Sequence, residues 1–137
     1  GPPPGRVAVI GYASGVTAGS VAQHPVERID VIEIEPAILE AERFFRDANG
    51  RPLDDPRVHP IVDDGRAHLA ASPGAYDVII SEPSYPWMSG VSNPIAREAL
   101  RPGGRLLQWV QLYALPPEDL YSILAALRSE FAYVYAF

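Results

Sequence analysis

Residues 6–15 read Arg-Val-Ala-Val-Ile-Gly-Tyr-Ala-Ser-Gly, a short apolar and β-branched run that breaks into a glycine-rich turn. The run predicts a buried strand, and the glycines predict a tight connection into a helix expected over residues 17–23. A strand, a glycine turn and a helix in this order are typical of the start of an α/β domain.

The same alternation continues to the end of the chain. Further strands are expected over residues 28–34, 58–62, 76–81, 105–110 and 132–137, and further helices over residues 36–45, 66–72, 93–100 and 117–130. Pro36 suits a first helical position, and Ile38, Ala41 and Phe45 should share the inner face of that helix. A turn is expected at residues 102–104, where the sequence is Pro-Gly-Gly.

Strands this apolar, joined by helices and short loops, predict a mainly parallel sheet covered on both faces. The fold class is therefore doubly wound α/β, with residues 6–137 as a single domain and residues 1–5 outside it. The chain begins Gly-Pro-Pro-Pro-Gly with no initiator Met. We expect this start to be a processed end or a cut inside a longer protein.

Composition narrows the classes of function. The chain has 137 residues, 47% hydrophobic, without an apolar run of the ~20 residues that a membrane span needs. Its net charge of −6, with eleven basic residues that are all Arg, argues against nucleic acid unless the Arg residues cluster. The acidic excess suits a cationic substrate, and solubility alone is the alternative explanation. The absence of Cys excludes disulfides, thiolate metal sites and a Cys nucleophile. We expect a cytoplasmic domain that makes no membrane contact.

The glycine turn is the first candidate ligand site. Gly11 and Gly15 let the backbone pass close to a ligand after the first strand. The pattern is not Gly-x-Gly-x-x-Gly, because its third and sixth positions are Ala13 and Val16. A tight strand-to-helix turn without a ligand is an equal alternative.

Carboxylates at the ends of the next two strands are further candidates. Glu33 occupies the position from which a carboxylate accepts both hydrogen bonds of a ribose diol, whereas Glu35 should point to the opposite face and lie on the surface. At the end of the third strand, Asp63 is expected to cap the following helix and Asp64, beside Gly65, to face the ligand. The two Asp roles could be exchanged.

Glu82 leaves the fourth strand inside a proline-rich and aromatic loop, where a carboxylate can bind or deprotonate an amine. Tyr85 and Trp87 would wall the pocket or cover the core. Other chemistries are disfavoured: the histidines at 24, 59 and 68 have no ligand spacing, so no metal is expected, and no Gly-x-Ser-x-Gly nucleophile motif is present.

Four motifs occur in a specific order: Val-Ile-Gly-Tyr-Ala-Ser-Gly (residues 9–15), Val-Ile-Glu-Ile-Glu-Pro (31–36), Val-Asp-Asp-Gly-Arg (62–66) and Tyr-Asp-Val-Ile-Ile-Ser-Glu-Pro-Ser-Tyr-Pro-Trp (76–87). This order resembles the spermidine synthase family, and within it bacterial spermidine synthase-like proteins, some of which carry the domain behind membrane segments. The resemblance implies the Rossmann-like fold of class I S-adenosylmethionine-dependent methyltransferases.

The family transfers an aminopropyl group from decarboxylated S-adenosylmethionine to an amine such as putrescine and releases methylthioadenosine. The resemblance implies that Gly11, Ala13 and Gly15 line the donor site, that Glu33 holds the ribose, and that Asp64 with Gly65 reads the adenine. Glu82 falls where the family has its catalytic Asp, which orients the amine and accepts its proton. Tyr85 and Trp87 would bind the amine. No metal takes part.

The chain departs from the family at several positions. The family's glycine loop usually has an Asp where this chain has Ser14, and Tyr85 replaces a second acidic residue, so polyamine binding should be weaker. The family's N-terminal β domain and its final antiparallel strand have no counterpart in the sequence, so the chain is expected to be truncated at both ends. The open sheet edge could then pair with another copy.

Two alternatives to an aminopropyltransferase follow from the same residues. The loop that begins Glu82-Pro83-Ser84-Tyr85 also resembles the Asn-Pro-Pro-Tyr loop of amine methyltransferases, which would use S-adenosylmethionine. A non-catalytic nucleoside-binding or assembly module is the third possibility, since the amine-side domain is absent.

Overall fold

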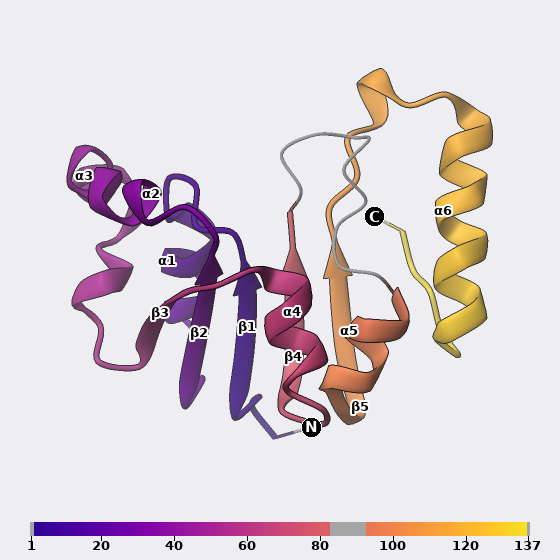
Figure 1. Cartoon of the computed structure of the whole chain (residues 1–137), viewed down its shortest axis with the longest axis horizontal. Coiled ribbons are helices and arrows are strands. Elements are labelled where there is room, and N and C mark those ends of the chain that lie inside the picture. The colour runs from indigo at the N-terminus through magenta and orange to yellow at the C-terminus, as the bar shows by residue number, and fades with distance from the viewer. Residues whose placement is uncertain (1, 83–92, 137) are drawn as a thin grey trace.

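The central element of the fold is a parallel sheet. The computed structural model describes residues 2–82 and 93–136. Within them the strands are β1 (Arg6–Ile10), β2 (Arg28–Glu33), β3 (Val58–Val62), β4 (Tyr76–Ser81) and β5 (Leu100–Gln108). They form one five-stranded sheet in the order β3-β2-β1-β4-β5, with every pair parallel (Figure 1). The predicted parallel α/β architecture is confirmed.

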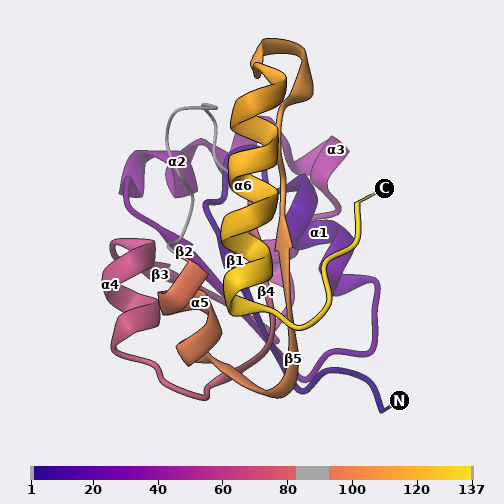
Figure 2. The ribbon, with the colours of Figure 1, turned by 90° about the vertical axis from the view of Figure 1, so that its right-hand side faces the viewer.

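Helices cover both faces of this sheet, as a doubly wound fold requires. They are α1 (Val16–Ala22), α2 (Pro36–Glu40), α3 (Arg46–Asn49), α4 (Gly65–Ala70), α5 (Asn93–Ala99) and α6 (Pro117–Glu130), with 3₁₀ turns η1 (Ala41–Phe44), η2 (Pro52–Asp54) and η3 (Leu112–Ala114). Viewed along the sheet, α1 lies on one side and α4 and α5 on the other (Figure 2).

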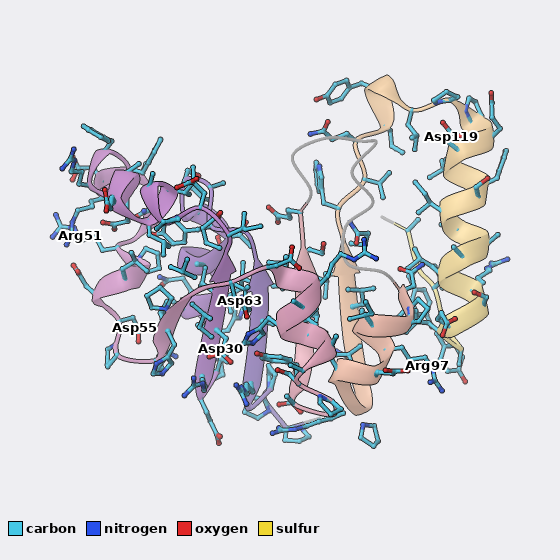
Figure 3. The ribbon with its side chains drawn as sticks, in the orientation of Figure 1. Asp30, Arg51, Asp55, Asp63, Arg97 and Asp119 are labelled. Atoms are coloured by element: carbon cyan, nitrogen blue, oxygen red, sulfur yellow. The ribbon has the colours of Figure 1, made fainter. Side chains whose placement is uncertain are left out.

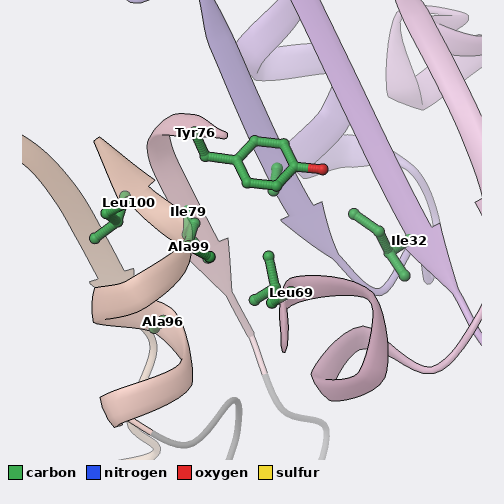
Figure 4. Close-up of a cluster of buried hydrophobic side chains, with 8 residues drawn as sticks. Ile32, Leu69, Tyr76, Ile79, Ala96, Ala99 and Leu100 are labelled. Carbon is green, nitrogen blue, oxygen red and sulfur yellow. The ribbon is translucent and has the colours of Figure 1, made fainter. Parts of the chain in front are cut away.

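Each face has its own hydrophobic core because side chains alternate along the strands. On β1, Ala8 belongs to the core under α4 and α5, while Val7 and Val9 belong to the core under α1. The first core is shown in Figure 4 and consists of Ala8, Ile32, Leu69, Tyr76, Ile79, Ala96, Ala99 and Leu100. These two cores fix the strand ends from which the candidate site residues emerge.

The strand order reverses between β1 and β4. From β1 the chain passes to β2 and β3 on one side, and it then returns to β4 and β5 on the other (Figure 1). At this switch point the last residues of the two strands, Ile10 and Ser81, are paired in register. Gly11 and Glu82 therefore leave neighbouring strand ends, where ligands bind in open α/β sheets.

The predicted helix over residues 36–45 is not continuous. Pro36 does begin α2, but α2 ends at Glu40 and is followed by the 3₁₀ turn η1. A 3₁₀ turn winds more tightly than an α-helix, so it rotates the inner face away from its expected position. Glu42 is consequently only 5% exposed and Phe45 is 41% exposed, so the prediction that Phe45 faces inward is wrong.

The C-terminal region also differs from the prediction. The turn at residues 102–104 lies inside β5 as an irregularity, because the register jumps from Tyr76–Leu100 to Val78–Arg105. The sixth strand was predicted over residues 132–137, and its described part, residues 132–136, belongs to no strand, so the prediction is wrong over that range. Alternating aromatic residues favour an extended chain, but a strand also needs a neighbour for its backbone hydrogen bonds. No strand in the described part of the chain pairs with the outer edge of β5.

A substitution at the contact between α1 and α3 is expected to have a large effect on stability. A Cβ atom on Gly19 would lie 1.8 Å from the backbone carbonyl oxygen of Asn49. Gly19→Ala is therefore expected to lower the free energy of unfolding by about 3 kcal/mol, although Ala normally favours a helix. Urea unfolding measures the change. Ser20→Ala, at an exposed position of the same helix, should stay within about 0.5 kcal/mol. Equal midpoints for Gly19→Ala and the parent would contradict the close contact.

Candidate active site

A cavity of about 500 Å³ opens at the carboxyl ends of β1, β2 and β4. The described residues that line it are Val9, Ile10, Gly11, Tyr12, Ala13, Ser14, Val16, Thr17, Glu33, Ile38 and Glu82. The structure thus brings together four of the predicted site residues, namely Gly11, Ala13, Glu33 and Glu82. Glu33 and Glu82 are the two acidic residues in this lining.

The glycine loop presents its backbone to this cavity. Gly11 has φ +86°, and no atom of residues 2–82 and 93–136 lies within 4 Å of the position that its Cβ would take, so within the described chain this part of the loop is open to a ligand. Gly15 is different, because a Cβ there would lie 2.4 Å from the hydroxyl of Tyr12. Gly15 is not among the lining residues. The structure therefore gives Gly15 a packing role and leaves its predicted contact with a ligand untested.

Glu33 is held in a fixed orientation at the end of β2. Its side chain accepts hydrogen bonds from the backbone N–H of Tyr12 (2.8 Å, to Oε2) and of Glu35 (2.9 Å, to Oε1). The residue is only 7% exposed. A carboxylate has about four lone-pair directions, so each oxygen can accept one further bond. Glu33 can therefore receive a pair of ligand hydroxyls without losing its own support.

Glu35 has a separate structural role. Its side chain accepts a hydrogen bond from the backbone N–H of Ala37 at 3.0 Å and so caps α2. The residue is exposed and does not line the cavity, in agreement with its prediction as a surface residue.

Glu82 follows β4 directly and is exposed at the rim of the cavity. One of its oxygens, Oε2, accepts a hydrogen bond from the hydroxyl of Thr17 at 2.9 Å. Sequence reasoning missed Thr17, because 65 positions separate it from Glu82. The only signal was its place on the helix that follows the glycine loop.

The prediction that Asp63 caps the helix after β3 is wrong. Asp64, not Asp63, caps α4, and it does so by accepting from the N–H of Ala67 at 2.9 Å. Asp63, labelled in Figure 3, accepts from the N–H of Asp64 and lies 3.5 Å from Nδ1 of His68. Asp64 takes the cap because it directly precedes the first helical residue, Gly65.

Asp64 and Gly65 do not line the cavity. A Cβ on Gly65 would lie 2.7 Å from Cγ2 of Ile10, so this glycine allows α4 to begin close to the end of β1. The predicted adenine contact of Asp64 and Gly65 stays a prediction. Tyr85 and Trp87, predicted to bind the amine, lie outside the described residues.

The glycine loop is held by contacts with buried residues that sequence reasoning also missed. Asn49 is buried and donates from Nδ2 to the carbonyl of Ser14 at 3.0 Å. Tyr12 is buried, and its burial, together with the negative charge of Glu42, raises the pKa of its hydroxyl to about 12. Gly50 ends α3 in the left-handed region, as suits an Asn-Gly pair. This local pattern does not show that Asn49 reaches the glycine loop.

Residues 2–82 and 93–136 contain no group of three or more His, Asp or Glu side chains that could hold a metal ion. In the same ranges no helix has both the length and the apolar character needed to cross a membrane.

The fold and the position of the cavity define a Rossmann-like α/β domain of the methyltransferase type. The structure of a spermidine synthase in complex with the transition-state analogue AdoDATO has this fold, with a TM-score of 0.83 and 22% sequence identity. The alignment covers 96% of this chain and 48% of that one. Residues 2–104 match the model of the spermine/spermidine synthase domain. The chain belongs to the spermine/spermidine synthase family.

Curated relatives carry names of two activities. The polyamine aminopropyltransferase of Mycobacterium tuberculosis is 30% identical over 90% of this chain and 26% of its own length. The spermidine synthase of Coffea arabica is 38% identical over 75% of this chain and 35% of its own. Putrescine N-methyltransferase 1 of Nicotiana tabacum is 32% identical over 95% of this chain and 37% of its own length. The chain thus spans about a quarter to two fifths of these relatives.

Proposed function

We propose that this domain transfers an aminopropyl group from decarboxylated S-adenosylmethionine to a small amine such as putrescine. The observation that carries the proposal is the pair of carboxylates, Glu33 and Glu82, on one cavity at the switch point of the sheet. Membership of the spermine/spermidine synthase family supports it, as do relatives named polyamine aminopropyltransferase and spermidine synthase.

The donor would bind against β1 and β2. The lone pairs of Glu33 that remain free would accept the two ribose hydroxyls, while the open backbone at Gly11 and Ala13 lets the nucleoside approach closely. Asp64 and Gly65, one strand further along at β3, would contact the adenine. Such contacts fix the donor so that its reactive carbon points toward the end of β4.

Glu82 would act on the acceptor amine. The neutral amine nitrogen attacks the aminopropyl carbon that is bound to the donor's positively charged sulfur. A carbon–nitrogen bond forms as the carbon–sulfur bond breaks, and the electron pair of that bond leaves with sulfur, which gives methylthioadenosine. The nitrogen then releases a proton to the Glu82 carboxylate. Glu82 also orients the amine by accepting its hydrogen bond, with Tyr85 and Trp87 proposed as walls of the amine pocket.

Donor choice gives a direct test of this function. Calorimetry should show that decarboxylated S-adenosylmethionine binds at least about tenfold more tightly than S-adenosylmethionine. The physical reason is that the extra carboxylate of S-adenosylmethionine would approach Glu82, and two like charges about 4–6 Å apart repel by about 1–3 kcal/mol in a partly exposed site. Methylthioadenosine should bind as well.

Other outcomes of the same titrations would favour other functions. A preference for S-adenosylmethionine would favour a methyltransferase, the activity for which the Nicotiana relatives are named. Failure of all three nucleosides to bind would favour a non-catalytic module.

A further inference from the structure

We propose that Thr17 is a positioning residue, which couples the donor-binding loop to the carboxylate of Glu82. The inference rests on the proposed function and deepens it, because it identifies what holds the base in place. Thr17 lies in the first turn of α1, directly after the glycine loop, and lines the same cavity as Glu82. Its hydroxyl donates to Oε2 of Glu82 at 2.9 Å.

The direction of this hydroxyl is informative. Ser and Thr hydroxyls in helices commonly bond back to a carbonyl three or four residues earlier. Ser20, one turn further along α1, does so and donates to the carbonyl of Val16 at 2.9 Å. For Thr17 the carbonyl three residues earlier is that of Ser14, which already accepts from Asn49 at 3.0 Å. Thr17 donates instead across the cavity, from α1 to the end of β4.

The contact gives Glu82 a defined geometry. With Oε2 engaged by Thr17, the other oxygen, Oε1, is left to accept from the amine. An exposed Glu side chain without this bond would sample several rotamers, and most of them would point away from the reacting nitrogen.

Both carboxylates of the cavity are tied to the same short segment. Glu33 accepts from the backbone N–H of Tyr12, and Glu82 accepts from the hydroxyl of Thr17. Residues 12–17 therefore set the spacing between the carboxylate that would hold the ribose and the one that would receive the amine proton. Displacements near 1 Å between reacting groups can cost about a hundredfold in rate.

Steady-state kinetics with decarboxylated S-adenosylmethionine and putrescine test the proposal in three variants. Thr17→Val keeps the size and the branching of the side chain but removes the hydroxyl that donates the hydrogen bond to Glu82. Its kcat should fall about 10- to 100-fold. Its KM for decarboxylated S-adenosylmethionine and its affinity for methylthioadenosine should change less than about threefold, because no contact with the nucleoside is lost. Thr17→Ser should retain kcat within about threefold of the parent, since it keeps the hydroxyl.

Ser20→Ala is the matched control, because it removes a hydroxyl from the same helix that does not contact Glu82. It should keep the parental kcat. Parental kcat in Thr17→Val would overturn the inference, and so would an equal loss in Thr17→Ser, which would assign the effect to packing of the methyl group. Loss of methylthioadenosine binding in Thr17→Val would indicate a structural role and would also overturn it. If the parent itself transfers to no amine, the proposed function fails first.

Discussion

Glu82→Gln is expected to lower kcat by about 10²–10⁴-fold, the usual contribution of a general base. The change is nearly isosteric, and the amide oxygen of Gln can still accept the hydrogen bond that Thr17 donates to Glu82. An amide cannot take up a proton at neutral pH, so the orientation of the side chain is kept while its chemistry is lost. Transfer of the aminopropyl group, followed as methylthioadenosine release, measures the effect.

Two controls separate this effect from damage to the site. Methylthioadenosine should bind Glu82→Gln with nearly parental affinity in calorimetry, because the proposed nucleoside site lies on the side of Glu33. Glu35→Gln changes an acidic residue that caps α2 and does not line the cavity, so its kcat should stay parental. A Glu82→Gln protein with parental kcat would remove Glu82 from the mechanism and would leave the donor site as the only part of the proposal that stands.

The elements predicted most accurately are those with strong local patterns. The bounds of β3, β4 and α6 agree with the prediction residue for residue: Val58–Val62, Tyr76–Ser81 and Pro117–Glu130. For α6 the signal is apolar spacing at i, i+3, i+4 and i+7 behind a proline, and for β4 it is an almost continuous apolar run between turn residues. These signals lie within one element, so no tertiary information is needed to interpret them.

Errors arose where the local pattern does not decide the outcome. The sequence favours one continuous helix over residues 36–45, but the 3₁₀ turn η1 interrupts it and buries Glu42 in place of Phe45. Residues 132–137 were predicted as a strand, but within residues 132–136 the chain forms none, because a strand needs a neighbour for its backbone hydrogen bonds. Asp64 rather than Asp63 caps α4 because it directly precedes Gly65, and two adjacent Asp residues do not show by themselves which of them takes that position.

The candidate site could be predicted from the sequence only where its residues stand directly at strand ends. Glu33 and Glu82 stand directly at strand ends, and in a parallel sheet all such ends meet on one edge, so their shared cavity follows from the order of the elements. Thr17 and Asn49 act through contacts to residues 65 and 35 positions away. Only the folded chain shows that Thr17 contacts Glu82 and that Asn49 contacts the glycine loop.

Asp30→Asn is expected to lower the free energy of unfolding by about 3 kcal/mol at pH 7. Asp30, labelled in Figure 3, is 0% exposed in β2. It accepts hydrogen bonds from Arg6 Nε and Arg28 Nε, both at 2.8 Å, and from the hydroxyl of Tyr76 at 3.0 Å. Removing one partner of a buried ion pair costs about 3–5 kcal/mol. The lower end applies, since the side chains of Arg6 and Arg28 are 33% and 44% exposed and can turn toward water.

The effect of Asp30→Asn should also depend on pH in a defined direction. Burial alone would raise the pKa of Asp30, but the hydrogen bonds from Arg6, Arg28 and Tyr76 outweigh it and hold the pKa below its ordinary value of 3.8. A group whose pKa is lower in the folded state stabilises the fold fully above its unfolded pKa and loses this contribution as the pH falls through the folded value. The difference between parent and variant should therefore be constant from about pH 7 to pH 5 and shrink below about pH 4.

Urea unfolding at a series of pH values measures this dependence. Asp47→Asn is the control, because the side chain of Asp47 is fully exposed and its nearest ion-pair distance, to Arg51, is 3.8 Å. It should unfold like the parent at every pH. If Asp30→Asn were as stable as the parent at pH 7, the guanidinium groups of Arg6 and Arg28 would form their hydrogen bonds with water instead. The buried carboxylate would then contribute to the specificity of strand pairing rather than to stability. A difference that grew toward acid pH would contradict the lowered pKa of Asp30.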